Sequence, residues 1–171
     1  MRHQEQRDAG DVYGVKECFF LPYVDGELVY SRNLLGDVVR VVREVRPYAV
    51  FTHDPEVIFH RENFINHNDH RVSGLAATDA VYPSARDRLN FPEHLEEGLQ
   101  THKVQELYLW GTNQVNFVVD ISEVVDKKIE GLKKHVSQFG DGEFFTEERD
   151  SWWKDEQGRY VERFRKISLQ F

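Results

Sequence analysis

Hydrophobic and polar positions at the start of the chain predict a helix, a strand and a loop. Residues 2–13 are mostly polar and predict a short helix, which Gly14 is well placed to end. The apolar run within residues 15–21 then predicts a buried strand. Residues 22–33 contain the turn signal Asp25-Gly26 and therefore predict a loop.

The next helix and strand carry the strongest pattern in the sequence. Leucine and valine recur at helical spacing over residues 34–46, with charged residues between them, and Pro47 ends this helix. Residues 48–52 form a short apolar run of the kind found in buried parallel strands. A helix that leads through a proline into a buried strand is typical of α/β proteins.

The alternation continues in the second half of the chain. Residues 53–69 predict a long polar loop that is rich in histidine, and a helix follows at about residues 70–82. Strands are predicted at residues 104–110 and 115–119, and no element is predicted between that helix and these strands.

A last helix is predicted by the capping-box spacing of Asp120 and Glu123. Its expected buried side chains are spaced by four, three and four residues: Val125, Ile129, Leu132 and Val136. The order of elements predicts an α/β fold in a single domain over residues 1–171. A helix in first place is unusual, because a strand normally leads a doubly wound sheet.

Composition and charge narrow the classes of function. The formal net charge of −8 argues against a sequence-independent nucleic-acid binder, since such proteins need a basic face. No apolar stretch approaches the roughly 20 residues of a membrane-spanning helix, so no membrane span is expected. Cys18 is the only cysteine and cannot form an internal disulfide, which favours a reduced, cytoplasmic location.

The residues that could carry chemistry gather in two segments after the strand predicted at residues 48–52. The first is His53-Asp54-Pro55, and the second is Asn66-His67-Asn68-Asp69-His70-Arg71, just before a predicted helix. In open α/β sheets ligands bind beyond the carboxyl ends of the strands, where both segments are expected to lie.

His67 and His70 are three residues apart, a spacing that places two side chains on one face of a helical turn. Neutral imidazole suits zinc, and Asp69 could orient one imidazole by accepting the proton of its far nitrogen. A catalytic zinc has three protein ligands, and the candidates for the third are His53, Asp54 and His60. The other interpretation is that the two imidazoles are solvated or cap a helix.

Six segments, in order along the chain, together carry a family resemblance. The most specific is Asn66 to Arg71, which is close to N-H-P-D-H-R with Asn68 in place of the usual proline. The other segments are Arg2–Gln6, Gly14–Gly26, Val42–Pro55, Asp120–Gln138 and Glu162–Arg165. On these matches the sequence resembles the PIG-L/LmbE-like family of zinc-dependent de-N-acetylases.

The resemblance implies a Rossmann-like fold, with a mostly parallel sheet and flanking helices, and a hydrolase that removes the acetyl group of an N-acetylglucosamine-type amine. It implies that His70 is a zinc ligand, and that His67 stabilises the oxyanion or protonates the leaving amine, with Asp69 as its partner in the catalytic group. Asp25 and Asp54 fall in loops that flank the sugar site in relatives, so they are the candidate substrate-binding residues. The expected partner is a small N-acetylated sugar or sugar conjugate.

One motif of the family, H-P-D-D, does not occur in the sequence. In the family it follows the first strand and supplies two zinc ligands and the general base, so by resemblance His70 is the one zinc ligand of three in this chain. We therefore expect the family's first strand-helix unit to be absent. Three hypotheses follow: the natural product is a longer, active deacetylase, the chain is an inactive truncated homologue, or it is a module that binds a sugar or a partner.

A missing first strand has a consequence for association. The strands predicted at residues 15–21 and 48–52 would lose a neighbour, and an unpaired strand edge invites self-association. A homo-oligomer is therefore one expected state of the chain.

Overall fold

The computed structural model describes residues 1–60, 64–140 and 151–170. Contacts divide the chain into two compact units, one formed by Met1–Phe20 with Val118–Glu162 and the other by Leu21–Phe117 with Arg163–Phe171. Each unit is described by itself below, and the single domain expected over residues 1–171 stays a prediction. Over the described residues, no helix has both the length and the apolar character that crossing a membrane requires.

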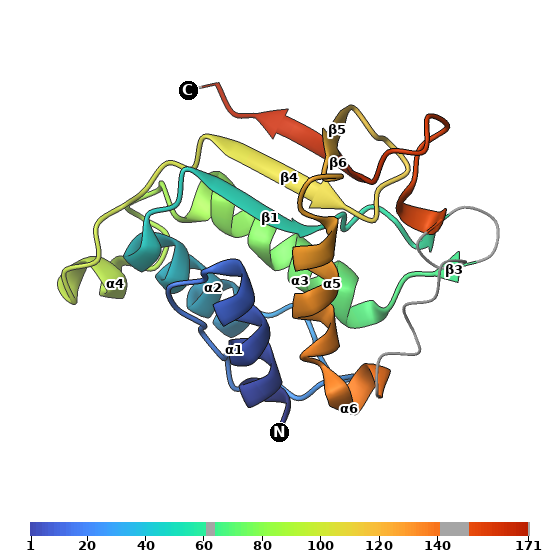
Figure 1. The fold of residues 1–171 in the computed structure, drawn as a ribbon. Helices are drawn as coiled ribbons and strands as arrows, with labels where there is room; N and C mark the ends of the chain where they lie inside the picture. The colour runs from blue at the N-terminus through green and yellow to red at the C-terminus, as the bar shows by residue number, and fades with distance from the viewer. Residues whose placement is uncertain (61–63, 141–150, 171) are drawn as a thin grey trace. The chain divides into compact units, whose positions relative to one another are not determined.

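The sheet confirms the α/β class. Strands β1 (Ala49–His53) and β4 (Glu106–Trp110) are parallel neighbours, with Val50 opposite Leu107 (Figure 1). Strand β6 (Val161–Ser168) pairs with β4 in the antiparallel direction, and the sheet order is β1-β4-β6-β5, with β5 at Phe117–Asp120. Helix α3 (Asn68–Asp79) packs along β1, and α2 (Arg32–Val45) packs against α3.

Helix α2 lies close to the predicted residues 34–46, but it begins two residues earlier, at Arg32, and ends at Val45. The Ser31 hydroxyl accepts a hydrogen bond from the Leu34 N–H at 3.1 Å, which satisfies one of the N–H groups at the helix start. Arg46 has a left-handed backbone with φ 52°, and Pro47 follows, so the helix cannot continue. The apolar stripe of α2 therefore lies in a fixed register.

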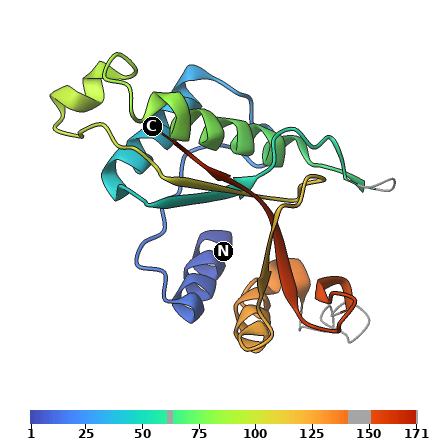
Figure 2. The same cartoon turned by 90° about the horizontal axis from the view of Figure 1, so that it is seen from above.

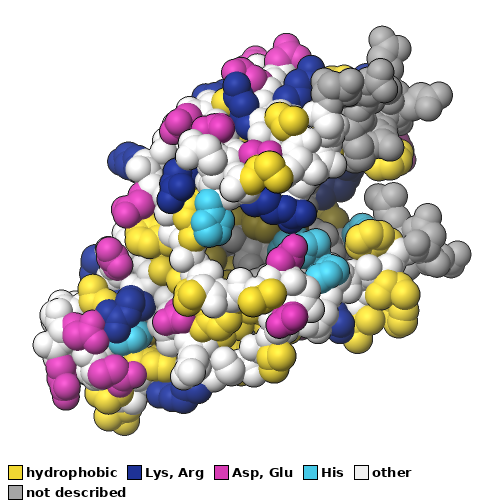
Figure 3. All heavy atoms as spheres, turned by 90° about the horizontal axis from the view of Figure 1, so that it is seen from below, with side chains coloured by type: hydrophobic (Ala, Val, Ile, Leu, Met, Phe, Trp, Pro, Cys, Tyr) yellow, Lys and Arg dark blue, Asp and Glu magenta, His cyan; other side chains and the backbone are white. Residues whose placement is uncertain are grey.

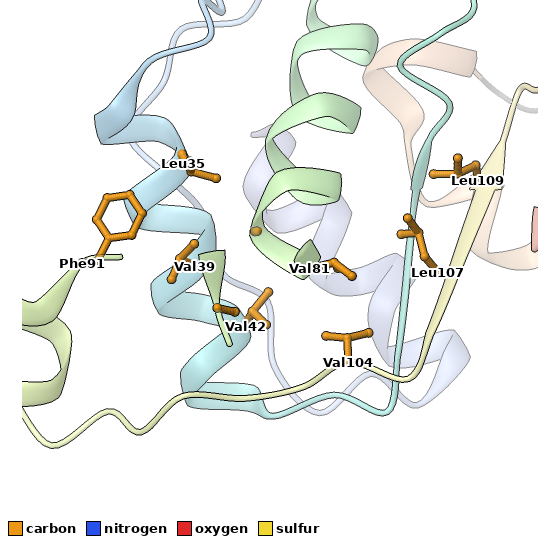
Figure 4. Packing of buried hydrophobic residues seen from close by; sticks show 10 residues of the cluster. Leu35, Val39, Val42, Val81, Phe91, Val104, Leu107 and Leu109 are labelled. Atoms are coloured by element: carbon orange, nitrogen blue, oxygen red, sulfur yellow. The ribbon is translucent and has the colours of Figure 1, made fainter. Parts of the chain in front are cut away.

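That stripe supplies much of the hydrophobic core of this unit. Leu35, Val39 and Val42 project from α2 toward Leu107 and Leu109 of β4 (Figure 4). Val81 and Val104 fill the space between them, and Val39 and Val104 have no exposed surface. This burial of apolar side chains provides the driving force that holds α2 and α3 on the sheet.

Arg43 is the exception on α2, because it is polar and yet only 1% exposed. Its guanidinium donates hydrogen bonds of 2.8–3.2 Å to five carbonyl oxygens, those of Ser84, Ala85, Asp87, Asn90 and Phe91. A buried guanidinium is tolerated only when its N–H groups find acceptors. Arg43 therefore shapes the segment that leads into the short helix α4 (Pro92–Glu96).

Several predicted elements differ from the structure. Residues 15–21 form no strand, because none of the strands in the described part of the chain pairs with them, and Phe20 instead stacks on His3 with ring centroids 4.1 Å apart. The helix predicted at residues 70–82 begins earlier, at Asn68, and ends at Asp79, and the backbone of Tyr82 beyond it is extended, with φ −147° and ψ 124°. Helix α4 and strand β6 were not predicted, because neither has a regular hydrophobic period.

The other unit contains α1 (Arg2–Tyr13), α5 (Val125–Lys133), the short helix α6 (Val136–Phe139) and a 3-10 turn at Ser151–Trp153. Helix α1 ends at Gly14 with φ 77°, as predicted, and lies beside α5 (Figures 1 and 2). The Tyr13 hydroxyl donates to the Lys128 carbonyl oxygen at 2.8 Å. Val136 was expected to be buried but is 59% exposed, because α5 ends at Lys133 and α6 starts a new helix.

Residues of this unit that carry the family resemblance contact one another. The Glu5 carboxylate accepts hydrogen bonds from the Ser137 N–H at 2.9 Å and the Ser137 hydroxyl at 2.6 Å. The Lys128 ammonium lies 2.5 Å from the Glu162 carboxylate. These contacts join segments that are far apart in the sequence.

Replacing Arg43 by methionine should reveal how much the buried guanidinium stabilises the fold. Each buried acceptor left unpaired costs about 1–3 kcal/mol. All five carbonyl oxygens lose the guanidinium, and those of Ala85 and Phe91 keep the His102 and His94 N–H groups as donors. We expect Arg43→Met to lower the free energy of unfolding by about 3 kcal/mol or more, measured by urea denaturation.

The matched control is Arg40→Met on the same helix, since Arg40 is partly exposed and pairs with Glu97 at the surface. Loss of an exposed ion pair should cost about 1 kcal/mol or less. Equal losses for the two variants would contradict the structural role assigned to Arg43.

Candidate functional site

The candidate site is built at the N-terminal end of α3, within the unit that contains the core. The stretch predicted as a loop at residues 53–69 holds a short antiparallel hairpin of β2 (Phe59–His60) and β3 (Phe64–Ile65). The Asn66 N–H donates to the Ile58 carbonyl oxygen at 2.8 Å, so the chain leaves the hairpin at a fixed position. His67 then caps α3, and His70 lies in its first turn.

Hydrogen bonds decide which nitrogen of His70 carries the proton. The Asn66 side-chain N–H donates to the Val57 carbonyl oxygen at 3.0 Å, which turns the Asn66 carbonyl oxygen toward His70 Nδ1, 3.2 Å away. An amide oxygen only accepts, so His70 Nδ1 must be the donor. The lone pair of the neutral ring therefore lies on Nε2, the form that a metal ion binds.

His67 has the opposite arrangement. Its Nδ1 accepts a hydrogen bond from the Asp69 backbone N–H at 3.1 Å, so the neutral ring carries its proton on Nε2. The ring centroids of His67 and His70 are 5.5 Å apart. The first turn of α3 thus presents the Nε2–H donor of His67 beside the Nε2 lone pair of His70. His67 caps the helix through Nδ1, and its Nε2–H remains for chemistry.

His53, at the end of β1, is stacked on His70. The two ring centroids are 4.0 Å apart and the planes differ by 6°, while Trp110 Nε1 donates to His53 Nδ1 at 2.8 Å. Desolvation lowers the pKa of His53 to about 4, with a further contribution from His70. Desolvation and the neighbouring His67 lower the pKa of His70 as well, so both rings are neutral at pH 7.

The stacking bears on the metal-ligand candidates. An imidazole binds a metal ion in its own ring plane, and the planes of two stacked rings that differ by 6° do not meet at one ion. The Nδ1 lone pair of His53 is also occupied by Trp110. Over the described residues, no group of three or more His, Cys, Asp or Glu side chains could hold a metal ion. These residues therefore fit one zinc ligand, His70, and not a complete zinc site.

Asp54, a candidate for substrate binding and for metal ligation, is only 1% exposed. One carboxylate oxygen accepts the Glu56 N–H at 3.0 Å, and the other has no hydrogen-bond partner among the described residues. His60, the remaining ligand candidate, is half-buried, and its Nδ1 is likewise buried without a partner in that part of the chain. Asp54 and His60 thus each have a buried polar atom that no described residue pairs.

The charges of Asp69 and Asp25 both act on His70. Asp25 lies in the loop from Leu21 to Ser31, which precedes helix α2. Its negative charge opposes the fall in the pKa of His70. Asp69 lies 4.0 Å from His67 Nδ1, but its carboxylate oxygens accept backbone N–H groups of the loop that contains Asp25. On the face drawn in Figure 3, histidine side chains gather with an acidic side chain beside them.

Gly74 is a residue of the site that sequence reasoning missed. It lies one turn after His70 on α3, and a Cβ added there would overlap the carbonyl oxygen of His53. Glycine is therefore what allows α3 to approach β1 closely enough for the two imidazoles to stack. The available signal was an isolated glycine inside a helical pattern, which often marks a close approach of the backbone.

Comparisons with known proteins agree with this architecture. Residues 1–81 match the sequence model of the PIG-L family, described as GlcNAc-PI de-N-acetylase. A diacetylchitobiose deacetylase of Thermococcus kodakarensis is 32% identical over 138 residues, which are 81% of this chain and 49% of that protein. The chain thus spans about half the length of this curated relative.

Solved structures give the same result. The N,N'-diacetylchitobiose deacetylase from Pyrococcus horikoshii, in complex with its inhibitor MPG, has a TM-score of 0.84 and 27% identity, over 98% of this chain and 63% of that one. Two further structures share the fold, each with a TM-score of 0.72. One is a conserved protein from Thermus thermophilus, with 22% identity over 99% of this chain and 74% of that one. The other is a 4-carboxy-2-hydroxymuconate hydratase from Pseudomonas putida, with 18% identity over 99% of this chain and 72% of that one.

The fold and the site therefore define an α/β protein with a histidine pair at the carboxyl edge of its parallel strands. The chain belongs to the PIG-L/LmbE-like family, and the resemblance seen in its sequence is confirmed. The relatives from Thermococcus kodakarensis and Pyrococcus horikoshii are diacetylchitobiose deacetylases.

Adding a methyl group at Gly74 should disturb the site through α3. We expect Gly74→Ala to lower the free energy of unfolding by about 1–3 kcal/mol, because the helix must move away from β1. It should also shift the ring-proton resonances of His53 and His70, which report the stacking. Ser73→Ala, at the adjacent and partly exposed position, is the control. Unchanged histidine resonances in Gly74→Ala would refute the role assigned to this close approach.

The low pKa of His53 predicts a pH dependence of stability. Between the pKa of an unfolded histidine, about 6.5, and the folded value of about 4, the unfolded state binds a proton that the folded state does not. Stability should therefore fall as the pH is lowered from 7 to 5. Urea midpoints at the two pH values measure this loss, which we expect to be smaller in His53→Asn. An equal loss in that variant would contradict the assignment.

Proposed function

We propose that this chain is a deacetylase, a hydrolase that removes the acetyl group from an N-acetylglucosamine-type amine. Membership of the PIG-L/LmbE-like family supports this proposal, as do the two diacetylchitobiose deacetylases that it resembles. The substrate would be a small N-acetylated sugar or sugar conjugate.

The observation that carries the proposal is the arrangement of ring protons on His67 and His70. Amide hydrolysis develops negative charge on the carbonyl oxygen and requires a proton for the leaving amine. The Nε2–H of His67, fixed by the Asp69 N–H on its far side, is a donor that can serve either need. Its place at the start of α3 adds the positive end of the helix dipole.

Zinc enters the proposal through one residue. His70 would ligate it through Nε2, whose lone pair is left available because Nδ1 is turned toward Asn66. A bound zinc ion activates water and polarises the amide carbonyl. Since a catalytic zinc has three protein ligands, the remaining ligands would have to come from outside the described residues.

Other residues of the chain would bind and orient the substrate. Asp25 and Asp54 are the proposed substrate-binding carboxylates, and Asp25 is the one whose charge reaches His70. The single cysteine favours a cytoplasmic protein. Exposed apolar side chains on the β2–β3 hairpin, Phe59 at 64% and Ile65 at 70%, are compatible with self-association.

The second candidate function is a module that binds a sugar or a partner without turnover. The incomplete ligand set among the described residues favours it. Saturable binding of N-acetylglucosamine without added metal, together with no acetate release, would select this function over the enzyme.

Release of acetate from N,N'-diacetylchitobiose in the presence of zinc is the direct test. We expect turnover to fall by about 10²–10³ in His67→Gln, the usual effect of losing one oxyanion donor. His102→Gln is the control, since His102 bonds the Pro47 carbonyl oxygen away from α3. Retained turnover in His67→Gln would contradict the role of this residue.

Zinc titration by calorimetry accompanies the activity assay. With a single well-placed ligand, this chain should bind zinc weakly on its own, and His70→Gln should remove that binding. Tight zinc binding that survives in His70→Gln would rule out the proposed ligand.

A further inference from the structure

The loop from Leu21 to Ser31 is fastened to helices at three places. At its start the Tyr23 hydroxyl donates to the Asp37 carboxylate on α2 at 2.7 Å, and near its end the Tyr30 hydroxyl donates to Asp79 at the end of α3, at 2.5 Å. Its middle is held at the other end of α3, by Asn68 and Asp69. This middle attachment is the one beside His67 and His70.

Asp69 holds the loop through two backbone N–H groups. One carboxylate oxygen accepts the Gly26 N–H at 2.6 Å and the other accepts the Leu28 N–H at 3.3 Å. The Asp69 side chain is only 14% exposed, and the Gly26 N–H is the main cause of its lowered pKa. The carboxylate therefore serves the loop in its ionised form, as a charge-assisted acceptor.

Asn68 adds a hydrogen bond in which the helix donates and the loop accepts. Its side-chain N–H donates to the Leu28 carbonyl oxygen at 2.9 Å, so Leu28 is held through both of its backbone polar groups. Asn68 stands where the resembled motif has proline, and a proline has no side-chain donor. This attachment is therefore a property of the present sequence.

The fastened segment carries Asp25 toward the histidines. Asp25 immediately precedes Gly26, whose φ of 86° only glycine adopts readily, so holding the Gly26 N–H fixes the turn that directs Asp25. Asp69 and His70 are adjacent on α3, so the turn that Asp69 holds lies next to His70. A loop that moved away from α3 would take this carboxylate with it.

We propose that Asn68 and Asp69 form a two-residue clamp that holds the Asp25–Leu28 turn over the His67/His70 site. They are positioning residues, and Asp25 is the group that they position for substrate. The part of this inference that concerns substrate rests on the deacetylase function proposed above, whereas the clamp itself does not.

Asn68→Pro is the sharpest variant for testing the clamp. Asn68 is the first residue of α3, where proline is favourable, and His67 before it has φ −59° and ψ 142°, a conformation that precedes proline easily. The helix should therefore stay intact while the hydrogen bond to Leu28 is lost. Asp69→Asn removes the charge of the main acceptor, and Asn90→Ala, which loses a side-chain bond to Asp87 in another loop, is the control.

Amide hydrogen exchange at Gly26 and Leu28 gives a readout that needs no catalysis. We expect exchange to quicken about fivefold in Asn68→Pro, the factor for one hydrogen bond of ordinary strength, and more in Asp69→Asn. The thermal midpoint of Asn68→Pro should not fall, and Asn90→Ala should leave both amides unchanged. Unchanged exchange in both clamp variants would overturn the proposal.

The substrate part is tested with N-acetylglucosamine. We expect Asn68→Pro to raise KM, or the dissociation constant of the sugar, about fivefold with kcat little changed, since Asn68 touches none of the reacting groups. Faster amide exchange with unchanged sugar affinity would overturn the positioning role. If the wild-type protein neither binds nor deacetylates the sugar, the proposed function fails, and amide exchange still decides the clamp.

Discussion

The close approach of α3 to β1 is the constraint on which the site depends. Gly74 lies against the His53 carbonyl oxygen, and one helical turn earlier this approach brings the ring of His70 onto the ring of His53. The stack and the two outer hydrogen bonds, from Trp110 and to Asn66, leave each imidazole with one defined tautomer. Gly74, in the middle of α3, thus determines how His70 in the first turn of that helix meets His53, because it sets the distance between the backbones of α3 and β1.

Several segments that carry the family resemblance have a structural explanation in this chain. Glu5 pairs with Ser137, Lys128 pairs with Glu162, and Arg43 satisfies five carbonyl oxygens of one loop. Family likeness at such positions reports how distant segments are joined, whereas likeness at His67 and His70 reports chemistry, and the sequence alone does not separate the two.

The sequence predicted best where local physics decides structure. Helix α2 combines a regular apolar stripe with a following proline, and its bounds lie within two residues of those predicted. Residues 15–21 are apolar too, but a strand exists only with a partner, and their side chains find other contacts, such as Phe20 on His3. Strand β6 was missed for the converse reason, since its alternation is weak and pairing with β4 defines it.

The sequence by itself determined the α/β class, the family, and the clustering of His67, Asp69 and His70 before one helix, because these follow from periodicity and from residues adjacent in the chain. Only the tertiary structure decided what each polar atom does. It turned the Asp69 carboxylate to the backbone of a loop more than 40 residues earlier, buried Asp54, and stacked His53 on His70. Hydrogen bonds between residues distant in the sequence produce no periodic pattern. They nevertheless determine which ring nitrogen carries a proton, which lone pair is available to a ligand and which side chains hold a loop in place.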